Sequence, residues 1–255
     1  MNLKFGTSVF VGHQTELCAL SDLEFFVLVG VTGVGKTTTL EALTKASWQF
    51  SSLPDRRIVT DVVMIEPLAG KTVTDREERF ALTAKYRELH PGGMAQAIGM
   101  LQLKLEQGKT PLVFDGLRGL EEVSFAAITY ARSRFIVLDA PDETRVERLL
   151  GRSDAFDRIS SGNHSGATLE QLQAIKGVDS VFSKTQLEKF ANLEQNGLTT
   201  SEIVAKTKIV VTERQNYNPI EARDYLLRLD SKRVLYVDTT TAKPEIIAQR
   251  IMDWV

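Results

Sequence analysis

The sequence has few of the residues that build disulfides and metal centres. Its 255 residues include one cysteine, Cys18, and three histidines. A single cysteine cannot form an intramolecular disulfide, which fits a reducing compartment, and we interpret Cys18 as a small buried hydrophobe rather than a catalytic thiol. His13, His90 and His164 are isolated from one another and have no metal-ligand partner at a suitable spacing, so we predict no zinc site.

The sequence also lacks an excess of charge and a long apolar segment. Its 31 lysines and arginines nearly balance 33 acidic residues, giving a net charge of -2, so we do not expect a nucleic-acid partner. No apolar run approaches the length of about 20 residues that a membrane span needs, and residues 1–5 do not resemble the core of a signal peptide. We therefore expect a cytoplasmic protein without a membrane partner, folded as a single domain over residues 1–255.

The most specific motif is the sequence GVTGVGKT at residues 30–37, a complete G-x-x-x-x-G-K-T phosphate-binding loop. An apolar run at residues 25–29 precedes it, as expected of a buried strand, and a helical pattern follows it. A glycine-rich turn into a helix directs backbone N–H groups at one anion, here the phosphates of ATP. Lys36 would reach the outer phosphates, and the Thr37 hydroxyl would be a ligand of Mg2+. The predicted contacts of ATP are Gly30, Thr32, Gly33, Val34, Gly35, Lys36, Thr37 and Thr38.

Strand-like and helical patterns alternate along the rest of the chain. The predicted strands cover residues 25–29, 57–65, 111–115, 135–139 and 234–237, and the predicted helices cover 36–49, 74–89, 94–107, 120–131, a segment from 141, and 244–254. This order predicts an α/β fold of the P-loop NTPase type, a three-layer structure in which helices flank a parallel sheet. Residues 160–206 break the rhythm, and we predict that they form a helical insertion with short helices, which could be a lid, a substrate cover or a dimer contact.

Acidic and basic residues follow the predicted strands, at the sheet edge where ligands bind. Asp115 ends the strand at 111–115 and could orient Mg2+, although a helix cap or turn is the alternative. Gly116 permits a tight turn, after which Arg118 would point toward the phosphates. Before the predicted second strand, Asp55, Arg56 and Arg57 could read a phosphate and a hydroxyl or base edge of an acceptor, or form an ordinary polar loop.

A stripe of arginines follows the strand at 135–139. Arg145, Arg148 and Arg152 share one face of the helix that begins after Pro141, and Arg158 comes shortly after it. The alternative is a solvated face paired with Glu143 and Glu147. Beside a phosphate loop, such a stripe is the expected way to neutralise a transferring phosphoryl group.

Three segments of the chain resemble those of nucleoside monophosphate kinases, deoxynucleoside monophosphate kinases and dephospho-coenzyme A kinases. The segments are residues 138–141 with the arginines that follow, residues 115–118 with Glu122, and residues 238–240 before the last helix. The resemblance implies a parallel-stranded core, ATP, Mg2+ and phosphoryl transfer to a small acceptor. It also implies that Lys36, Asp115, Arg148 and Arg152 are catalytic, that Arg118 binds the acceptor phosphate, and that Arg158 helps to close over the transferring group.

Two functions are compatible with these motifs. The first is an ATP-dependent kinase of a nucleotide or a similar small metabolite. The second is an ATPase or nucleotide-switched regulatory protein that acts on a partner through the helical insertion. A hydrolase more often has a glutamate beside the strand-end aspartate to activate water, whereas Gly116 follows Asp115 here, which favours transfer.

Overall fold

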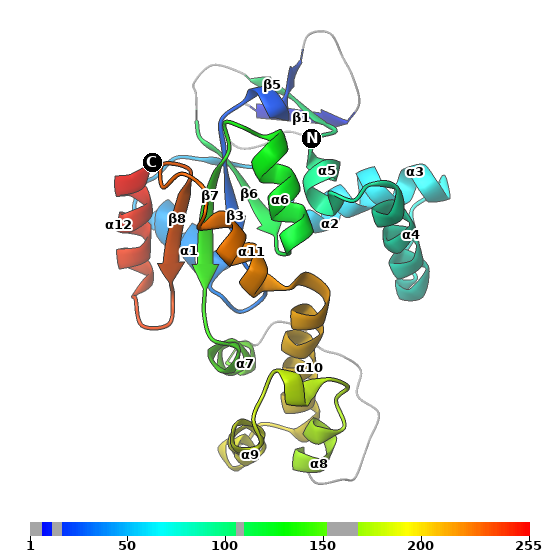
Figure 1. Ribbon diagram of the computed structural model, residues 1–255, viewed down its shortest axis with the longest axis vertical. Coiled ribbons are helices and arrows are strands. Elements are labelled where there is room, and N and C mark those ends of the chain that lie inside the picture. The colour runs from blue at the N-terminus through cyan, green and yellow to red at the C-terminus, as the bar shows by residue number, and fades with distance from the viewer. Residues whose placement is uncertain (1–6, 12–16, 106–109, 152–167) are drawn as a thin grey trace.

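The centre of the molecule is a parallel sheet of five strands in the order β4-β6-β3-β7-β8 (Figure 1). The computed structural model describes residues 7–11, 17–105, 110–151 and 168–255. The strands are β3 (Phe25–Val29), β4 (Ser51–Ser52), β6 (Leu112–Leu117), β7 (Arg134–Asp139) and β8 (Val234–Asp238). This sheet, with helices on its faces, confirms the predicted α/β fold of the P-loop NTPase type.

Strand β3 shows why the sheet is covered on both faces. All five of its side chains are buried. Because successive side chains of a strand point to opposite faces, Phe25, Val27 and Val29 join one hydrophobic cluster, and Phe26 and Leu28 join another. The first cluster includes residues of α5 (Gly93–Ile98), α6 (Leu120–Thr129) and α11 (Pro219–Leu226), and the second includes residues of α1 (Lys36–Lys45) and α12 (Pro244–Trp254).

A small antiparallel sheet lies above the main sheet in Figure 1. Its order is β1-β5-β2, with β1 (Thr7–Val11), β2 (Cys18–Ala19) and β5 (Leu101–Leu105), and a short 3-10 helix, η2 (Leu20–Asp22), follows β2. The predicted helix at 94–107 is therefore wrong in its second half, because residues 101–105 pair with β1 and β2 as a strand. Cys18 is exposed, which corrects the prediction of a buried residue.

The predicted strand at 57–65 is also wrong, because this segment is helical. It forms α2 (Arg56–Val59), a stretch of π-helix, η3 (Thr60–Ile65), and α3 (Glu66–Ala69). Asp55 caps α2 by accepting a hydrogen bond from the backbone of Ile58, and Val59 and Val63 are buried four residues apart, on one helical face. The helix that follows, α4 (Arg76–Leu89), agrees with its prediction.

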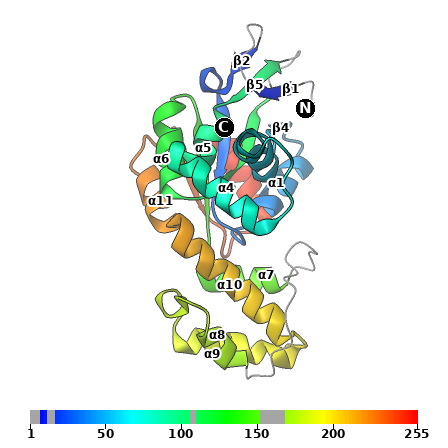
Figure 2. The same cartoon turned by 90° about the vertical axis from the view of Figure 1, so that its right-hand side faces the viewer.

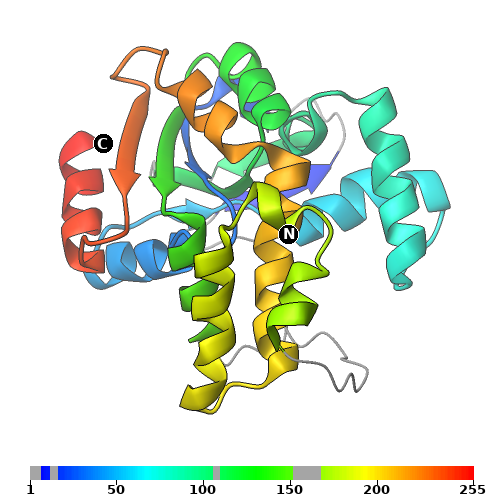
Figure 3. The same ribbon diagram turned by 60° about the horizontal axis from the view of Figure 1, so that its bottom comes forward.

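A helical unit lies below the sheet, at the edge where the parallel strands end (Figure 1 and Figure 3). It consists of α7 (Asp142–Leu150), α8 (Thr168–Gln173), η5 (Val178–Ser180), α9 (Lys184–Ala191), η6 (Asn192–Asn196) and α10 (Thr200–Tyr217). The unit has its own hydrophobic cluster, to which Val146, Leu172, Phe190 and Val210 belong. Helix α10 is longer than the short helices predicted here, and it runs back to the main sheet, where α11 begins (Figure 2). The assignment of residues 160–206 to an insertion in a single domain stays a prediction.

In the described part of the chain, no helix combines the length and the apolar composition that crossing a bilayer requires.

Candidate phosphate-binding site

The loop of residues 30–37 connects β3 to α1 through glycines with positive φ. Gly33 and Gly35 have φ values of 88° and 97°, which side chains rarely adopt. Gly35 is the N-cap of α1, and no described side chain caps this helix end. The first N–H groups of α1 are therefore available to an anion, as the sequence predicts.

Lys36 is held against this loop by three short contacts. Its Nζ donates hydrogen bonds to the carbonyl oxygens of Gly30, at 2.9 Å, and Val31, at 3.4 Å, and lies 3.7 Å from Asp115 Oδ1. Burial lowers the pKa of Lys36, and the neighbouring charge of Asp115 opposes this effect. The ammonium group thus lies inside the loop without a full counter-charge, which is a suitable position for a phosphate ligand.

Asp115 lies beside β3 because β6 is its immediate neighbour in the sheet. The register pairs Leu28 with Asp115 and then Val29 with Leu117, so Gly116 is an extra residue in β6. The strand therefore continues past Asp115 to Leu117, and Gly116 lies within it rather than in a turn, which corrects the sequence interpretation of both residues.

The carboxylate of Asp115 fits the predicted Mg2+ site. Its Oδ1 is buried and has no hydrogen-bond partner among the described residues. Its charged neighbour Lys36 lies at 3.7 Å, and because buried polar atoms nearly always make a hydrogen bond, this oxygen still has capacity for a ligand. Thr37 is exposed in the first turn of α1, and its hydroxyl oxygen would be a further ligand of the predicted Mg2+. Among the described residues, no group of three or more histidine, cysteine or acidic side chains could hold a metal ion on its own.

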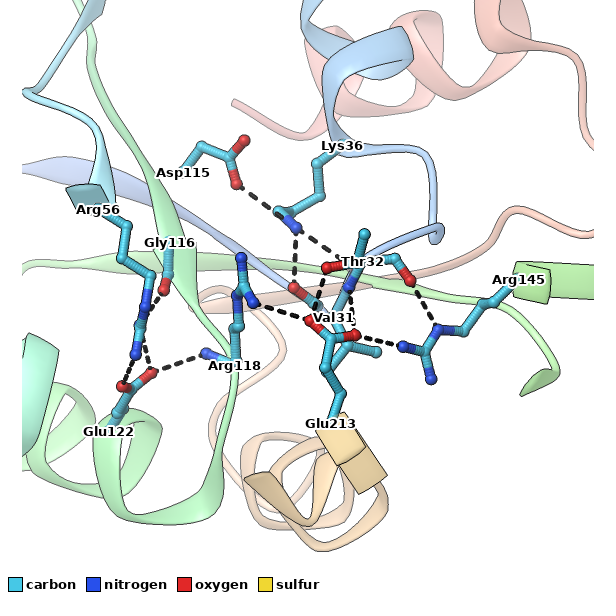
Figure 4. A network of polar contacts seen from close by, with 11 residues as sticks. Val31, Thr32, Lys36, Arg56, Asp115, Gly116, Arg118, Glu122, Arg145 and Glu213 are labelled. Carbon is cyan, nitrogen blue, oxygen red and sulfur yellow. Dashed lines mark hydrogen bonds and ion pairs between the residues drawn. The ribbon is translucent and has the colours of Figure 1, made fainter. Parts of the chain in front are cut away.

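Two predicted acceptor residues, Arg56 and Arg118, flank β6 (Figure 4). The Arg56 guanidinium makes a bidentate pair with Glu122, at 2.9 and 2.5 Å, and donates to the Gly116 carbonyl at 2.6 Å. The backbone N–H of Arg118 donates to the same Glu122, but its Nε is buried without a partner among the described residues. Both guanidinium groups face the ring of Tyr217, at 5.6 and 5.7 Å. Arg118 therefore keeps donors for a ligand, whereas the donors of Arg56 are largely used within the protein.

The other two predicted acceptor residues lie at the start of α2. Asp55 is exposed and acts as the helix cap, and Arg57 is exposed as well. The structure thus links Arg118 to the phosphate loop through Glu213 and leaves Asp55 and Arg57 exposed at the start of α2.

Two arginines of the predicted stripe, Arg145 and Arg148, contact the phosphate loop. Arg145 is fully buried and donates to the Thr32 carbonyl at 2.7 Å and to Asp142 at 2.5 Å. Arg148 donates to the carbonyl of Gly33 at 3.2 Å and to the carbonyl and hydroxyl of Thr239, at 2.6 and 3.0 Å. Arg152 and Arg158 lie outside the described residues.

A pocket of about 320 Å³ lies next to the phosphate loop, between the start of α1, the end of α7 and the segment after β8. It is lined by Gly35, Thr38, Thr39, Arg148, Gly151, Thr239, Thr240, Ala242, Pro244 and Ile247. Its volume and mixed polar and apolar lining suit the base or sugar of a small ligand whose phosphates lie in the loop.

A residue that the sequence analysis missed, Glu213, connects these groups (Figure 4). It lies on α10, is 6% exposed, and accepts hydrogen bonds from the backbone N–H of Thr32 at 2.9 Å and from its hydroxyl at 2.5 Å. It also accepts from Arg118 at 2.8 Å and Arg145 at 2.5 Å. No local pattern singles out this glutamate, because it lies 181 residues from Thr32 in a helix with many charged residues.

Loop, sheet and lysine together define a P-loop nucleotide-binding protein. The family model of the AAA domain matches residues 27–170, more than half of the chain, and the protein belongs to this family. No curated protein matches the sequence.

Several solved structures show a remote likeness. A gluconokinase from Sinorhizobium meliloti 1021 is 13% identical over 91% of this chain and 90% of its own, with a TM-score of 0.33. TT1252 from Thermus thermophilus is 17% identical over 90% and 94% of the two chains, with a TM-score of 0.38. A sulfotransferase domain from the curacin biosynthetic pathway is 12% identical over 91% and 73%, with a TM-score of 0.40.

Proposed function

We propose that the protein transfers a phosphoryl group from ATP, with Mg2+, to a small acceptor, a nucleotide or nucleotide-like metabolite. The observation that carries the proposal is the meeting of Lys36, Asp115 and Arg118 beside the phosphate loop (Figure 4). Each of these three groups is buried at least in part, and each retains binding capacity for a phosphate or a metal. Such a site provides what phosphoryl transfer needs most, which is positioning and neutralisation of charge.

The residues divide into a donor side and an acceptor side. The loop, with Gly30, Thr32, Gly33, Val34, Gly35, Lys36, Thr37 and Thr38, would bind the phosphates of ATP, and the adjoining pocket would hold the rest of the nucleotide. Asp115 and Thr37 would hold Mg2+, which when bound would neutralise charge on the phosphate oxygens. Arg118 would bind the phosphate of the acceptor, and Arg148, with Arg152 and Arg158, would act on the transferring group.

The carboxylates around the loop favour transfer over hydrolysis. A hydrolase needs a free carboxylate or amide to orient the attacking water. Among the described residues that contact the site, Glu213 is neutralised by Arg118 and Arg145, and Glu122 by Arg56. Asp115 Oδ1 has Lys36 as an ion-pair partner but accepts no hydrogen bond from the described residues, and we assign it to the metal.

One observation supports the second candidate, an ATPase or nucleotide-switched regulator. Glu213 connects helix α10 directly to the backbone of the loop, so a change in the loop on nucleotide binding or hydrolysis would reach the helical unit. A partner protein bound there would then respond to the nucleotide.

A screen of acceptors separates the two candidates. The purified protein is incubated with Mg-ATP and, one at a time, nucleoside monophosphates, deoxynucleoside monophosphates and dephospho-coenzyme A, and products are measured by mass spectrometry. We expect a phosphorylated product with one class of acceptor. ADP formed at the same rate without any acceptor would support the ATPase instead.

The Lys36→Ala variant tests the site itself. We expect it to abolish transfer, because the outer phosphates lose their only point charge from the loop, while the far-ultraviolet circular dichroism stays native-like. Unchanged turnover in a folded Lys36→Ala protein would exclude this site.

A further inference from the structure

The side chain of Glu213 is placed to orient Arg118. A guanidinium group has two edges that can bind an oxyanion through two parallel hydrogen bonds. Glu213 accepts from Nη1 of Arg118, at 2.8 Å, and thereby fixes the end of the group that lies nearer to α10. The opposite edge, Nε with Nη2, makes no hydrogen bond with the described residues, and its Nε is buried.

A second residue of α10 supports this orientation. Tyr217 follows Glu213 by four residues, so both side chains lie on the same face of the helix. The Arg118 guanidinium lies 5.7 Å from the centre of the Tyr217 ring, and an aromatic face holds a planar cation without using its N–H donors. Helix α10 therefore contacts Arg118 through two side chains and leaves the Nε–Nη2 edge without a hydrogen-bond partner among the described residues.

We propose that Glu213 is a positioning residue for the acceptor phosphate: it holds Arg118 so that the Nε–Nη2 edge faces a phosphate group beyond the γ-phosphate of ATP. This inference rests on the proposed function, in which Arg118 binds the acceptor. It gives α10 a specific role in the site, although the helix belongs to a part of the chain distant in sequence.

A purely structural role is the competing explanation. Glu213 also binds the N–H and hydroxyl of Thr32 and pairs with the fully buried Arg145, so it could serve only to hold the loop and the helical unit together. In that case, its loss would weaken the binding of every nucleotide that occupies the loop, and by the same factor.

Binding of adenosine 5′-tetraphosphate, compared with ATP, distinguishes the two roles without knowledge of the acceptor. In the proposed arrangement, the fourth phosphate would extend past the γ-position, toward the Nε–Nη2 edge of Arg118. We expect the wild-type protein to bind the tetraphosphate about tenfold more tightly than ATP in isothermal titration calorimetry, because a charge-assisted bidentate contact is added.

The Glu213→Gln variant should lose most of this preference, because its loss of affinity for the tetraphosphate exceeds its loss of affinity for ATP. The amide has one acceptor oxygen, so it cannot hold Arg118 and Arg145 together as the carboxylate does. In an Arg118→Gln background, the same change should have no further effect on the preference. Glu221→Gln, an exposed glutamate on α11, is the matched control and should behave as the wild type.

The outcomes separate this inference from the proposed function. An unchanged preference in folded Glu213→Gln protein, or an equal loss of both nucleotides, would overturn the inference alone. A wild-type protein without any preference would overturn the acceptor role of Arg118, and the positioning role of Glu213 with it. If Glu213→Gln does not fold, Glu213→Asp gives the same test, since it keeps both oxygens but shortens the reach, and we expect it to lose part of the preference.

Discussion

At the scale of the residue, the site contains charges that the protein has buried before any ligand arrives. Lys36 and Arg145 both lie beside the loop, but their surroundings differ. Arg145 is fully compensated by Asp142, Glu213 and the Thr32 carbonyl, whereas Lys36 has backbone carbonyls and a single carboxylate at 3.7 Å. A buried charge with incomplete compensation costs stability, and a ligand that supplies the missing charge recovers it. This difference marks Lys36 as a binding group and Arg145 as part of the framework.

The lowered pKa of Lys36 predicts how ATP binding depends on pH. Burial lowers this pKa below its ordinary value, and the phosphates of ATP favour the charged form. Above the pKa of the free protein, binding must therefore take up a proton, so ATP affinity should fall as pH rises from that pKa toward about 10.5. Calorimetric titrations between about pH 7 and about pH 10 measure this fall. Lys36→Arg, which stays protonated, should bind with a flat profile, and a wild-type profile just as flat would contradict the prediction.

The Arg148→Ala variant should differ in its effects on turnover and on ATP affinity. We expect turnover to fall more than ATP affinity, because a guanidinium that neutralises the transferring group contributes mainly in the transition state. In the structure Arg148 donates to Thr239 and Gly33, so it must leave at least one of these contacts to act. The measurements are kcat and the Kd of ATP for the variant. An equal loss in both would place Arg148 in ground-state nucleotide binding at the wall of the adjoining pocket.

The sequence predicts the residues whose role follows from a local motif. The loop residues, Lys36 and Asp115 belong to patterns that lie within a few positions of a strand end, and the structure brings them together. Glu213 could not be predicted, because its four hydrogen bonds reach three segments that are distant in sequence from α10. The pairing of Arg56 with Glu122 could not be predicted for the same reason. The bulge at Gly116 also depends on a distant segment, because it is defined by the pairing of β6 with β3.

At the scale of the element, the wrong secondary-structure predictions fall in segments whose structure depends on neighbours distant in sequence. The segment of α2 and η3 is rich in β-branched residues, which favour strands, but a cap at Asp55 and burial on one face make it helical. β5 continues the apolar pattern of α5 and becomes a strand because β1 and β2 pair with it. The strands of the main sheet were predictable because continuous apolar runs bounded by turns are characteristic of buried parallel strands.

The capping box of α9 predicts a measurable contribution to stability. Ser183 accepts a hydrogen bond from the backbone of Gln186, whose side chain accepts one from the backbone of Ser183 in return. Ser183→Ala should lower the free energy of unfolding by about 1 kcal/mol, because the backbone N–H of Gln186 loses the side-chain oxygen that accepts its hydrogen bond. Urea denaturation measures the loss. Thr185→Ala, an exposed position in the same helix, is the control and should be neutral or slightly stabilising. Equal stability of the two variants would contradict the role of the cap.

At the scale of the whole molecule, the sheet and the helical unit meet at the phosphate loop. Arg145 comes from α7, Thr32 from the loop and Glu213 from α10. Their contacts therefore join the loop that follows the central strand β3 to two helices of the helical unit (Figure 4). The two parts have separate hydrophobic clusters. Polar contacts at the site are therefore a principal connection between them among the described residues.

Nucleotide binding should consequently stabilise helix α10 as well as the loop. We expect ATP with Mg2+ to slow hydrogen exchange at backbone amides in the C-terminal half of α10. Glu213 binds the loop, so a nucleotide that stabilises the loop should also reduce local opening of this end of the helix. Exchange measured by mass spectrometry with and without nucleotide checks this, and peptides of α4, which lies away from the site, serve as the internal reference. Protection limited to residues 30–45 would show that the two parts are not coupled.

The long separation between Thr32 and Glu213 also has a consequence for folding. A contact between residues 181 apart closes a very large loop, and the entropy of that closure must be overcome before the contact contributes. The phosphate loop can form its turn locally, but its final arrangement requires that α10 has already been made and has returned to the sheet. A chain still emerging from the ribosome, or one truncated before residue 213, therefore has the complete motif without the finished site. Tight nucleotide binding would thus report that the entire chain, and not the motif alone, has reached its native arrangement.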